Sequence, residues 1–437
     1  MKFGSLTGGV KVHRVFIRDV ASTFSVRILS SILSLATSVI IARWLGPQGK
    51  GVVALALLVP NILALVLSFG IEVANVYFAG SRRVEVSKLT GNSLTFALIG
   101  TAVGTGLVGV LVATRNVERL VPGVPAWLLF VGMLGLPIGL LSSSFNAILQ
   151  GLQRISRVNG ISLVRVVGTL TFTAFLVISL KLSSLGVILA SLGAGLLSLI
   201  AAALLLLREG GTFGPIWDRS VLQKTLSFGL QGYVGNLLQF FNYRLDMFIV
   251  NFFLGAAGVG IYGVAVALAE FVWYLPNAIG FVIFPKAAAS RPELMNEFTP
   301  KVFGITLAST MLGSLPLVVF GHMLINFLFS ASFAEAYVPM LALLPGVVLL
   351  GGGKVLANEI AGRGYPIFNS INSGLALGLT VVLDLALIPS YGILGASIAS
   401  SISYSAIFVG AIVSYVVVSR KTSRALLWEV PNEPPVQ

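Results

Sequence analysis

The chain of 437 residues contains no cysteine and only two histidines, His13 and His322. Disulfide frameworks, iron–sulfur clusters and thiolate zinc sites are therefore excluded, and no metal site built on histidine is expected. Charge is also scarce, because 10% of the residues are charged, 56% are hydrophobic and the mean hydropathy is +0.98. A chain with so few polar side chains cannot coat a soluble globule of this size, so its expected solvent is lipid.

Acidic residues are the scarcer charge, with 15 Asp and Glu against 28 Lys and Arg. Such an excess suggests nucleic acid in a soluble protein, but here the placement of the cations in loops explains it, and no nucleic-acid partner is expected. The Gly-rich run Gly351–Lys354 is not a phosphate-binding Walker loop, because no glycine stands five positions before Gly353 and Val355 replaces Ser or Thr. We therefore expect no cofactor, apart from Na⁺ or H⁺ as a coupling ion.

Long apolar runs fill the chain and leave no room for a folded soluble domain. A helix that crosses a bilayer needs about 20 mainly apolar residues. The sequence predicts an all-α integral membrane protein of about twelve such helices, namely Ser22–Ile41, Val52–Ala79, Leu89–Ala113, Ala126–Leu149, Ile161–Leu180, Leu185–Leu207, Leu226–Val250, Val259–Phe284, Val302–Phe329, Tyr337–Glu359, Ile367–Ile388 and Tyr391–Val418.

The loops predict the orientation of these spans. Most Lys and Arg residues lie in loops on the same side as the N-terminus, whereas the opposite loops hold Arg43, Lys50, Arg115, Arg119 and Lys181. Because Lys and Arg concentrate in cytoplasmic loops, both termini of this multi-pass protein are expected in the cytoplasm, with the spans in the cell (inner) membrane.

The spans divide the chain into two groups of six. The longest connection carries Gly210-Gly211 and Gly214-Pro215 and is interpreted as a cytoplasmic linker. The basic segment before the first span is expected to lie on the membrane surface as a helix, or else to be a frayed tail. The predicted organisation is an interfacial segment at 1–21, a six-helix bundle at 22–207, the linker at 208–225, a second bundle at 226–418 and a cytoplasmic tail at 419–437.

Sequence similarity between the halves indicates duplication. Leu45-Gly46-x-x-Gly49-x-Gly51 recurs 209 positions later as Leu254-Gly255-x-x-Gly258-x-Gly260. Two further pairs of similar segments have nearly the same offset, namely Gln150-Gly151 with Ala361-Gly362 and Gly186–Ser191 with Gly392–Ser397. Six spans per half is an even number, so both halves enter the membrane from the same side. This predicts a parallel repeat about an axis along the membrane normal, with a site between the bundles.

Several motifs carry a resemblance to a known family. They are the Leu-Gly-x-x-Gly-x-Gly link, Phe69–Asn75, Asn242–Asp246, Ile261–Ala265, the stretch from Pro276 to Pro285, Gly362–Pro366 and Leu387–Ala396. In order and spacing they resemble the bacterial and archaeal polysaccharide-transporter flippases, members of the superfamily that also holds multidrug exporters and lipid II flippases.

The resemblance implies two six-helix bundles around a central cavity and a transporter rather than an enzyme. It implies alternating access by rocking bundles, which moves an undecaprenyl- or dolichyl-phosphate-linked oligosaccharide from the inner to the outer leaflet for surface polysaccharide assembly. The implied partners are this polyprenyl-phosphate-linked oligosaccharide, membrane lipids and polysaccharide polymerase machinery, with the transporter itself expected to be a monomer.

Ionisable residues inside the spans are functional candidates, because charge at bilayer depth is costly unless it is paired or hydrated. The cations are Arg27, Arg165, Arg244 and Lys354, and the anions are Glu72, Asp246, Glu270 and Asp384. Equal numbers allow a purely structural interpretation, in which ion pairs hold the bundles together. Alternatively, the cations bind the substrate head group, while the carboxylates carry protons or sodium or balance the cations.

Arg244 is the preferred candidate for phosphate binding, because it lies deep in its span and a guanidinium fits phosphate oxygens with two hydrogen bonds. Asp246, two residues on, points elsewhere around the helix and is not assumed to be its partner. Arg27 and Arg165 lie roughly 9 Å from a span's end at 1.5 Å per residue, so they either snorkel to the interface or line the cavity. Lys354 is the fourth head-group candidate.

Other functions remain as alternatives. An ion-coupled multidrug exporter shares the fold, but the deep Arg and Lys residues suit an anionic head group better than a cationic drug. A polytopic glycosyltransferase needs acidic residues on a sizeable outward loop. Here the outward loops are short and carry only Glu118 and Glu335 as acids. Lipid II flippases usually have two further helices, which 437 residues cannot accommodate.

Overall fold

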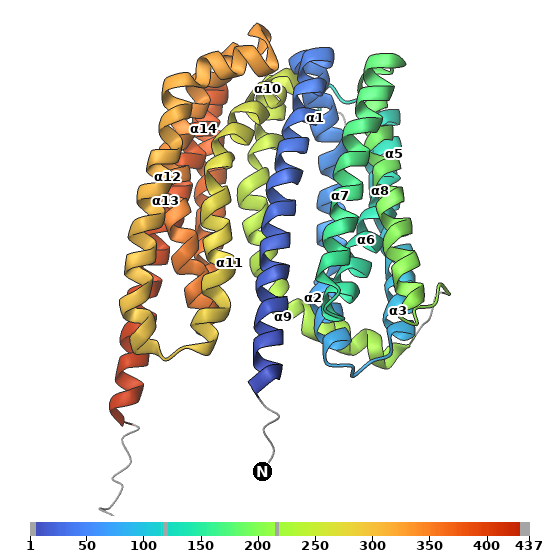
Figure 1. The fold of residues 1–437 in the computed structure, drawn as a ribbon. Coiled ribbons are helices and arrows are strands. Elements are labelled where there is room, and N and C mark those ends of the chain that lie inside the picture. Colours follow the sequence, from blue (N-terminus) through green and yellow to red (C-terminus); the bar gives the residue numbers. More distant parts are fainter. Residues whose placement is uncertain (1–5, 115, 117–120, 215–217, 429–437) are drawn as a thin grey trace, which may run out of the picture. The chain divides into compact units, whose positions relative to one another are not determined.

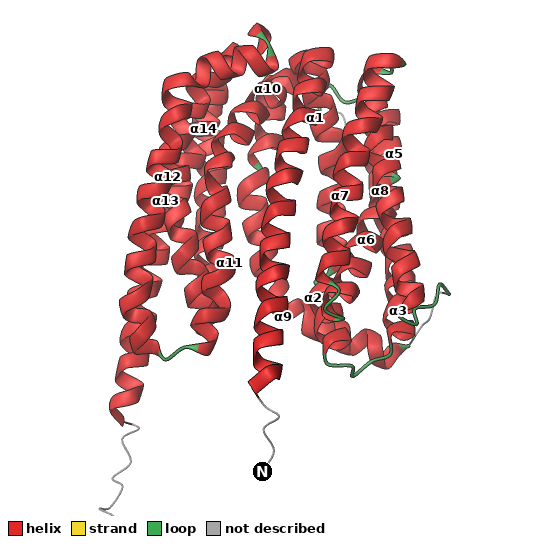
Figure 2. Ribbon diagram, viewed as in Figure 1, coloured by secondary structure: helices red, strands yellow, loops and turns green. Residues whose placement is uncertain are grey.

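The computed structural model describes residues 6–114, 116, 121–214 and 218–428, and in these ranges the chain is helical with no strand (Figures 1 and 2). Arg115, Glu118 and Arg119 and the predicted tail beyond residue 428 lie outside the described residues. The helices are α1 Leu6–Ser68, α2 Ile71–Gly80, α3 Val86–Ala113, α5 Ala126–Met133, α6 Gly135–Gly151, α7 Ile155–Thr173, α8 Ser183–Arg208, α9 Arg219–Arg244, α10 Asp246–Glu270, α11 Tyr274–Ala289, α12 Pro292–Phe329, α13 Tyr337–Gly362 and α14 Ile367–Trp428. Short π- or 3₁₀-helical segments lie at Ala174–Ser179, Phe271–Trp273 and Ala331–Ala336.

Within the described ranges, nine helical runs are long and apolar enough to cross a membrane. Three of them, Phe24–Ser68, Tyr233–Ala288 and Ile367–Arg420, are 45, 56 and 54 residues long, about twice the length that one crossing needs. Each of the three contains one glycine with non-helical backbone angles, which divides it into two spans. The described chain therefore has the twelve spans that the sequence predicts, and the all-α membrane fold is confirmed.

Helices α1 to α8 belong to the first of two compact units, which comprises Met1–Val234 and Gly255–Gly260. Helix α6 is central in this unit, because it packs against α1, α2, α3 and α8. Its buried side chains Phe145 and Ile148 meet Phe78 of α2 and Leu206 of α8 in one apolar cluster. The predicted linker at 208–225 lies wholly within this unit, since the chain leaves it only inside α9.

The second unit comprises Gly235–Leu254 and Ile261–Gln437. Helix α13 is its centre and packs against α11, α12 and α14. Ile283, Ala287, Met295 and Val355 form a buried apolar cluster where α11, α12 and α13 meet. Thus the fourth span of each half, α5–α6 in unit 1 and α13 in unit 2, occupies the centre of its own bundle.

The glycine motif that repeats in the sequence has the same backbone conformation in both halves. Gly46 has φ 64° and ψ −173°, and Gly255 has φ 70° and ψ −177°. A side chain is strained in this region of φ, so glycine is the residue that allows the sharp turn between two spans.

A second pair of repeated glycines makes equivalent contacts. A Cβ on Gly151, at the end of α6, would lie 2.5 Å from the carbonyl oxygen of Val76 in α2. A Cβ on Gly362, at the end of α13, would lie 2.5 Å from the carbonyl oxygen of Phe284 in α11. In both units, therefore, the central helix touches the backbone of the second span through a glycine.

Candidate functional site

Arg244 and Glu270 form an ion pair inside unit 2. Arg244 is the last residue of α9 and Glu270 the last of α10, so the ends of two successive helices bring them together. The guanidinium donates twice to the carboxylate, at 3.1 Å and 3.2 Å, and once to the carbonyl oxygen of Tyr243 at 3.1 Å. The Arg244 side chain keeps 30% of its surface exposed, so the pair is accessible rather than sealed in the core.

Lys354 of α13 lies beside this pair but binds no carboxylate within 4 Å in the described part of the chain. Its amine donates to Asn277 Oδ1 at 3.0 Å and lies 3.8 Å from the ring centroid of Trp273. The same amine is 5.8 Å from the ring of Tyr243, the residue next to Arg244. The two cations therefore lie around one aromatic surface, and cation–π attraction stabilises the amine there.

Three rings build that surface. The ring centroids of Tyr243, Trp273 and Tyr404 lie 5.5 to 5.8 Å apart in tilted or edge-to-face arrangements. The indole of Trp273 donates to the carbonyl oxygen of Val347 at 2.8 Å, which fixes its orientation. These contacts come from α9, the 3₁₀ segment Phe271–Trp273, α13 and α14, so the aromatic surface is a product of the packed unit.

Two buried aspartates lie in the same unit. Asp246, the first residue of α10, accepts hydrogen bonds from the Tyr262 hydroxyl at 2.5 Å, from the Ser400 hydroxyl at 3.5 Å and from the Met247 backbone at 2.7 Å. Asp384 of α14 is completely buried, and neither of its carboxylate oxygens has a hydrogen-bond partner among the described residues. An unpartnered buried carboxylate is costly, so Asp384 is the less compensated of the two aspartates.

The remaining candidates belong to unit 1. Arg27 of α1 and Arg165 of α7 have exposed side chains, and Glu72 in the first turn of α2 is half-buried. The structure therefore brings Arg244, Glu270 and Lys354 into one cluster and places none of these three within it. The roles of all eight residues stay predictions.

Sequence reasoning missed Asn277, Ser400 and Tyr404, which hold Lys354, Asp246 and the aromatic surface respectively. The sequence feature that could have indicated them is a polar side chain within an apolar run, because such a side chain needs a hydrogen-bond partner in lipid. That signal applies equally to many serines and asparagines of the spans, so it does not select these three.

The comparisons with known proteins identify the family. A model of the family described as "Polysaccharide biosynthesis protein" matches residues 16–289, well over half of the chain. The chain belongs to this family. Its resemblance to the polysaccharide-transporter flippases is thereby confirmed, and it is a multi-pass membrane protein.

Two curated archaeal proteins match this member of the family over part of their length. The uncharacterized membrane protein MJ1068 of Methanocaldococcus jannaschii is 24% identical over 43% of this chain and 38% of its own length. The probable low-salt glycan biosynthesis flippase Agl15 of Haloferax volcanii is 26% identical over 39% of this chain and 37% of its own length. The matched region thus spans less than half of either relative.

Solved structures match over nearly the whole chain. The lipid II flippase MurJ in its inward closed conformation has a TM-score of 0.74 at 15% identity, covering 95% of this chain and 93% of MurJ. An inward-facing multidrug resistance MATE family transporter of the MOP superfamily has a TM-score of 0.70 at 16% identity, covering 94% and 99%. At this level of identity the likeness shows the fold of the superfamily alone.

Proposed function

We propose that this transporter is a flippase that moves a polyprenyl-phosphate- or polyprenyl-diphosphate-linked oligosaccharide from the inner to the outer leaflet of the cell membrane by alternating access. The observation that carries the proposal is the cluster of Arg244 and Lys354 around Tyr243 and Trp273 within the spans. Two cations on an aromatic surface suit an anionic phosphate that is bonded to a sugar, because cations bind phosphate oxygens and sugar rings stack on aromatic side chains.

The ion pair of Arg244 is compatible with this role. Glu270 neutralises the guanidinium in the absence of substrate and so reduces the cost of a charge within the membrane. An arriving phosphate offers the same two-oxygen geometry as the carboxylate, and it can replace Glu270 as the partner of Arg244. Lys354, which has no carboxylate partner in the part of the chain that the structure describes, adds a second positive charge for the same group.

Ion coupling is the proposed energy source. The two buried aspartates supply carboxylate oxygens, and Tyr262 and Ser400 supply hydroxyls next to Asp246. Oxygen groups of this kind bind Na⁺, and a buried carboxylate without a partner equally suits a proton. Asp384 is therefore the residue at which a cation or proton from the gradient would bind. In this proposal the transporter works as a monomer, and both of its termini face the cytoplasm. The exported glycan passes to polysaccharide polymerase machinery.

The test is translocation of lipid-linked oligosaccharide in proteoliposomes. Arg244→Ala/Glu270→Ala removes both charges together, so no unpaired charge is left in the span, and we expect it to fold and to translocate at least about tenfold more slowly. Arg208→Gln, which removes an exposed charge at the end of α8, is the control and should translocate normally. Translocation by the double variant at the wild-type rate would show that the pair is structural.

A genetic experiment separates the flippase from the multidrug exporter, whose fold is the same. Deletion of the gene should cause lipid-linked oligosaccharide to accumulate in the inner leaflet. Normal surface glycan combined with hypersensitivity to cationic drugs would instead identify an exporter and overturn the proposal.

A further inference from the structure

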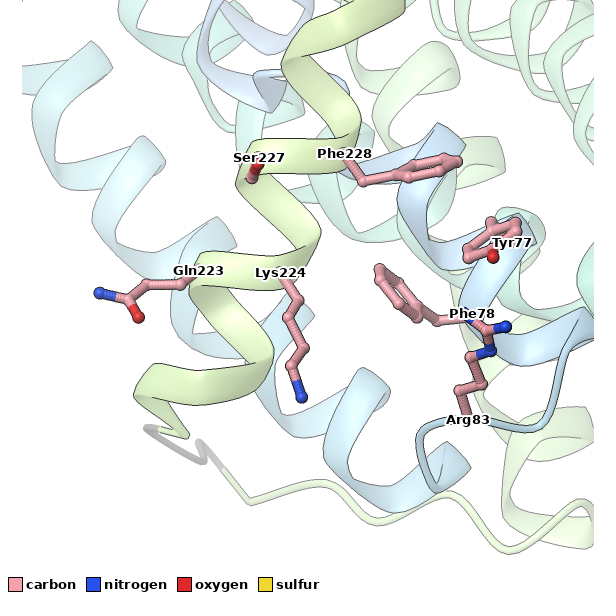
Figure 3. A pocket seen from close by; sticks show the side chains of 7 residues that line it. All are labelled: Tyr77, Phe78, Arg83, Gln223, Lys224, Ser227 and Phe228. Atoms are coloured by element: carbon pink, nitrogen blue, oxygen red, sulfur yellow. The ribbon is translucent and has the colours of Figure 1, made fainter.

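A hollow of about 500 Å³ lies in unit 1, between the end of α2 and the first turns of α9 (Figure 3). Helix α9 contributes Gln223, Lys224, Ser227 and Phe228. Gln223 and Ser227 are four residues apart, as are Lys224 and Phe228, so the four lie on one face of the helix. The hollow is open to its surroundings rather than enclosed, so a bulky head group can reach it. None of the residues around this hollow belongs to the cluster of Arg244 and Lys354.

One wall of the hollow is aromatic. The rings of Tyr77 and Phe228 are stacked, with centroids 4.5 Å apart and an angle of 17° between the ring planes. Phe78 meets Phe228 edge-on at 5.9 Å, and the Arg83 guanidinium lies over the Tyr77 ring at 5.7 Å. The stacked rings fix the guanidinium beside the hollow, and an apolar wall strengthens any charge interaction formed against it.

The cations of the hollow have no acidic partner. Among the described residues, no carboxylate lies within 4 Å of Arg83 or Lys224. Other cations of unit 1 do have one, since Lys88 pairs with Asp218 at 3.5 Å and Arg154 pairs with Glu209 at 2.8 Å. Two unpaired cations on either side of an aromatic wall favour an anionic ligand.

We infer that this hollow is a loading site that binds the phosphate or diphosphate group of the lipid-linked substrate before it reaches the cluster around Arg244. Arg83 offers the two-pronged contact that phosphate oxygens accept, and Lys224 adds a point charge. Gln223 and Ser227, one turn apart, supply hydrogen bonds for the adjoining sugar. The inference rests on the proposed function, because a substrate taken from the inner leaflet loads from the side where the sequence places Arg83 and Lys224.

The natural absence of cysteine allows a direct experiment on the full chain. Ser227→Cys introduces a single thiol in the hollow, and its rate of reaction with a maleimide is measured in proteoliposomes with and without a short-chain polyprenyl diphosphate. We expect the lipid to slow this reaction at least about fivefold, because the bound diphosphate covers the thiol. Ser220→Cys, on the exposed start of α9 outside the hollow, should react at an unchanged rate.

Charge variants in the Ser227→Cys background identify the binding groups. Arg83→Gln/Lys224→Gln should abolish protection by the lipid. Arg82→Gln/Arg219→Gln removes the same number of charges from exposed residues that do not line the hollow, and it should preserve protection. Protection that survives Arg83→Gln/Lys224→Gln would overturn the inference.

Two other probes test the source of the phosphate. Equal protection by inorganic diphosphate at the same concentration would mean that the hollow binds free anions, and equal protection by an uncharged polyprenol would mean that the tail alone covers the thiol. Either result overturns the loading site. Failure of the proposed function is distinguishable, because the lipid would then still protect the thiol of Ser227→Cys while the wild-type protein translocates no lipid-linked oligosaccharide.

Discussion

Individual charged residues inside the spans differ in how the structure compensates their charge. Arg244 has a carboxylate partner, Lys354 has an amide oxygen and an indole ring, and Asp246 has hydroxyl and backbone donors. In the described ranges, the carboxylate of Asp384 has no hydrogen-bond partner. Because lipid offers no compensation of its own, a fully buried carboxylate without a partner in the described part of the chain is a place at which an ion is expected to bind.

Asp384→Asn tests this expectation. The substitution keeps the shape of the side chain and removes the uncompensated charge, so we expect a folded protein of unchanged or higher thermal stability whose translocation no longer responds to the ion gradient. The measurement is translocation in proteoliposomes with and without an imposed Na⁺ or H⁺ gradient. Glu297→Gln, at an exposed position of α12, is the control and should keep the full response. A gradient response that persists in Asp384→Asn would exclude this residue from coupling.

The lowered pKa of Glu209 should make the thermal stability of the protein depend on pH. Its carboxylate accepts from Arg154 and Arg157 at 2.8 Å, and the hydrogen bond from Arg154 is the main cause that lowers the pKa of Glu209. A lowered pKa stabilises the folded state above the ordinary value of about 4.3, and this contribution is lost as the pH falls through the folded-state pKa.

We therefore expect Glu209→Gln to lower Tm by about 1–2 °C at pH 7, since the ion pairs are exposed and weak. At pH 3 the difference between the variant and the wild type should be smaller than at pH 7, because protonation of Glu209 weakens its ion pairs. Thermal unfolding in detergent at both pH values checks this, and a larger difference at pH 3 than at pH 7 would contradict it.

At the scale of single helices, glycine decides where one span ends and the next begins. Helices α1, α10 and α14 are nearly continuous across two spans, and each turns at one glycine, namely Gly46, Gly255 or Gly392. The two repeated motifs also touch each other within unit 1, because a Cβ on Gly51 would overlap the backbone of Ala256 and one on Gly260 the backbone of Pro47. The contact is reciprocal, as expected for equivalent parts of a duplicated chain.

Gly260→Ala tests this contact. The added methyl group would collide with the carbonyl oxygen of Pro47, and we expect it to destabilise the fold by about 1–3 kcal/mol, the usual cost of overpacking. Gly263→Ala is the matched control in the same helix, because nothing lies within 4 Å of its Cβ position. It should leave stability unchanged or raise it by up to about 1 kcal/mol. Equal effects of both substitutions on thermal unfolding would show that the close approach does not matter.

At the scale of the whole molecule, the order of the spans predicts on which side of the membrane each loop lies. Helix α3 lies between Ser81 and Thr114 in the sequence. Its 28 residues are about 42 Å long at 1.5 Å per residue, enough for one crossing of the membrane, so Ser81 and Thr114 are expected on opposite sides. In the cysteine-free chain, a thiol at Ser81→Cys should react with a membrane-impermeant maleimide only from the cytoplasmic side. A thiol at Thr114→Cys should react only from outside. The reverse pattern would invert the predicted orientation.

Much of the fold could be predicted because hydropathy and duplication are properties of the linear sequence. Twelve apolar runs, the repeat of Gly46 at Gly255 and the parallel relation of the halves all follow from counting along the chain. The same counting identified Arg244, Glu270 and Lys354 as charges that need compensation. It could not say which of them meet, because any cation within a span could pair with any of the anions.

The sequence by itself determined that this protein is helical, crosses the membrane about twelve times, is built twice and carries charges at depth, because composition and periodicity alone decide what lipid accepts. Only the tertiary structure decided the partners. Arg244 meets Glu270 across 26 positions, Lys354 meets Asn277 across 77, and Ser400 meets Asp246 across 154. Contacts between residues so far apart depend on how the helices pack, and no local pattern in the chain records that packing.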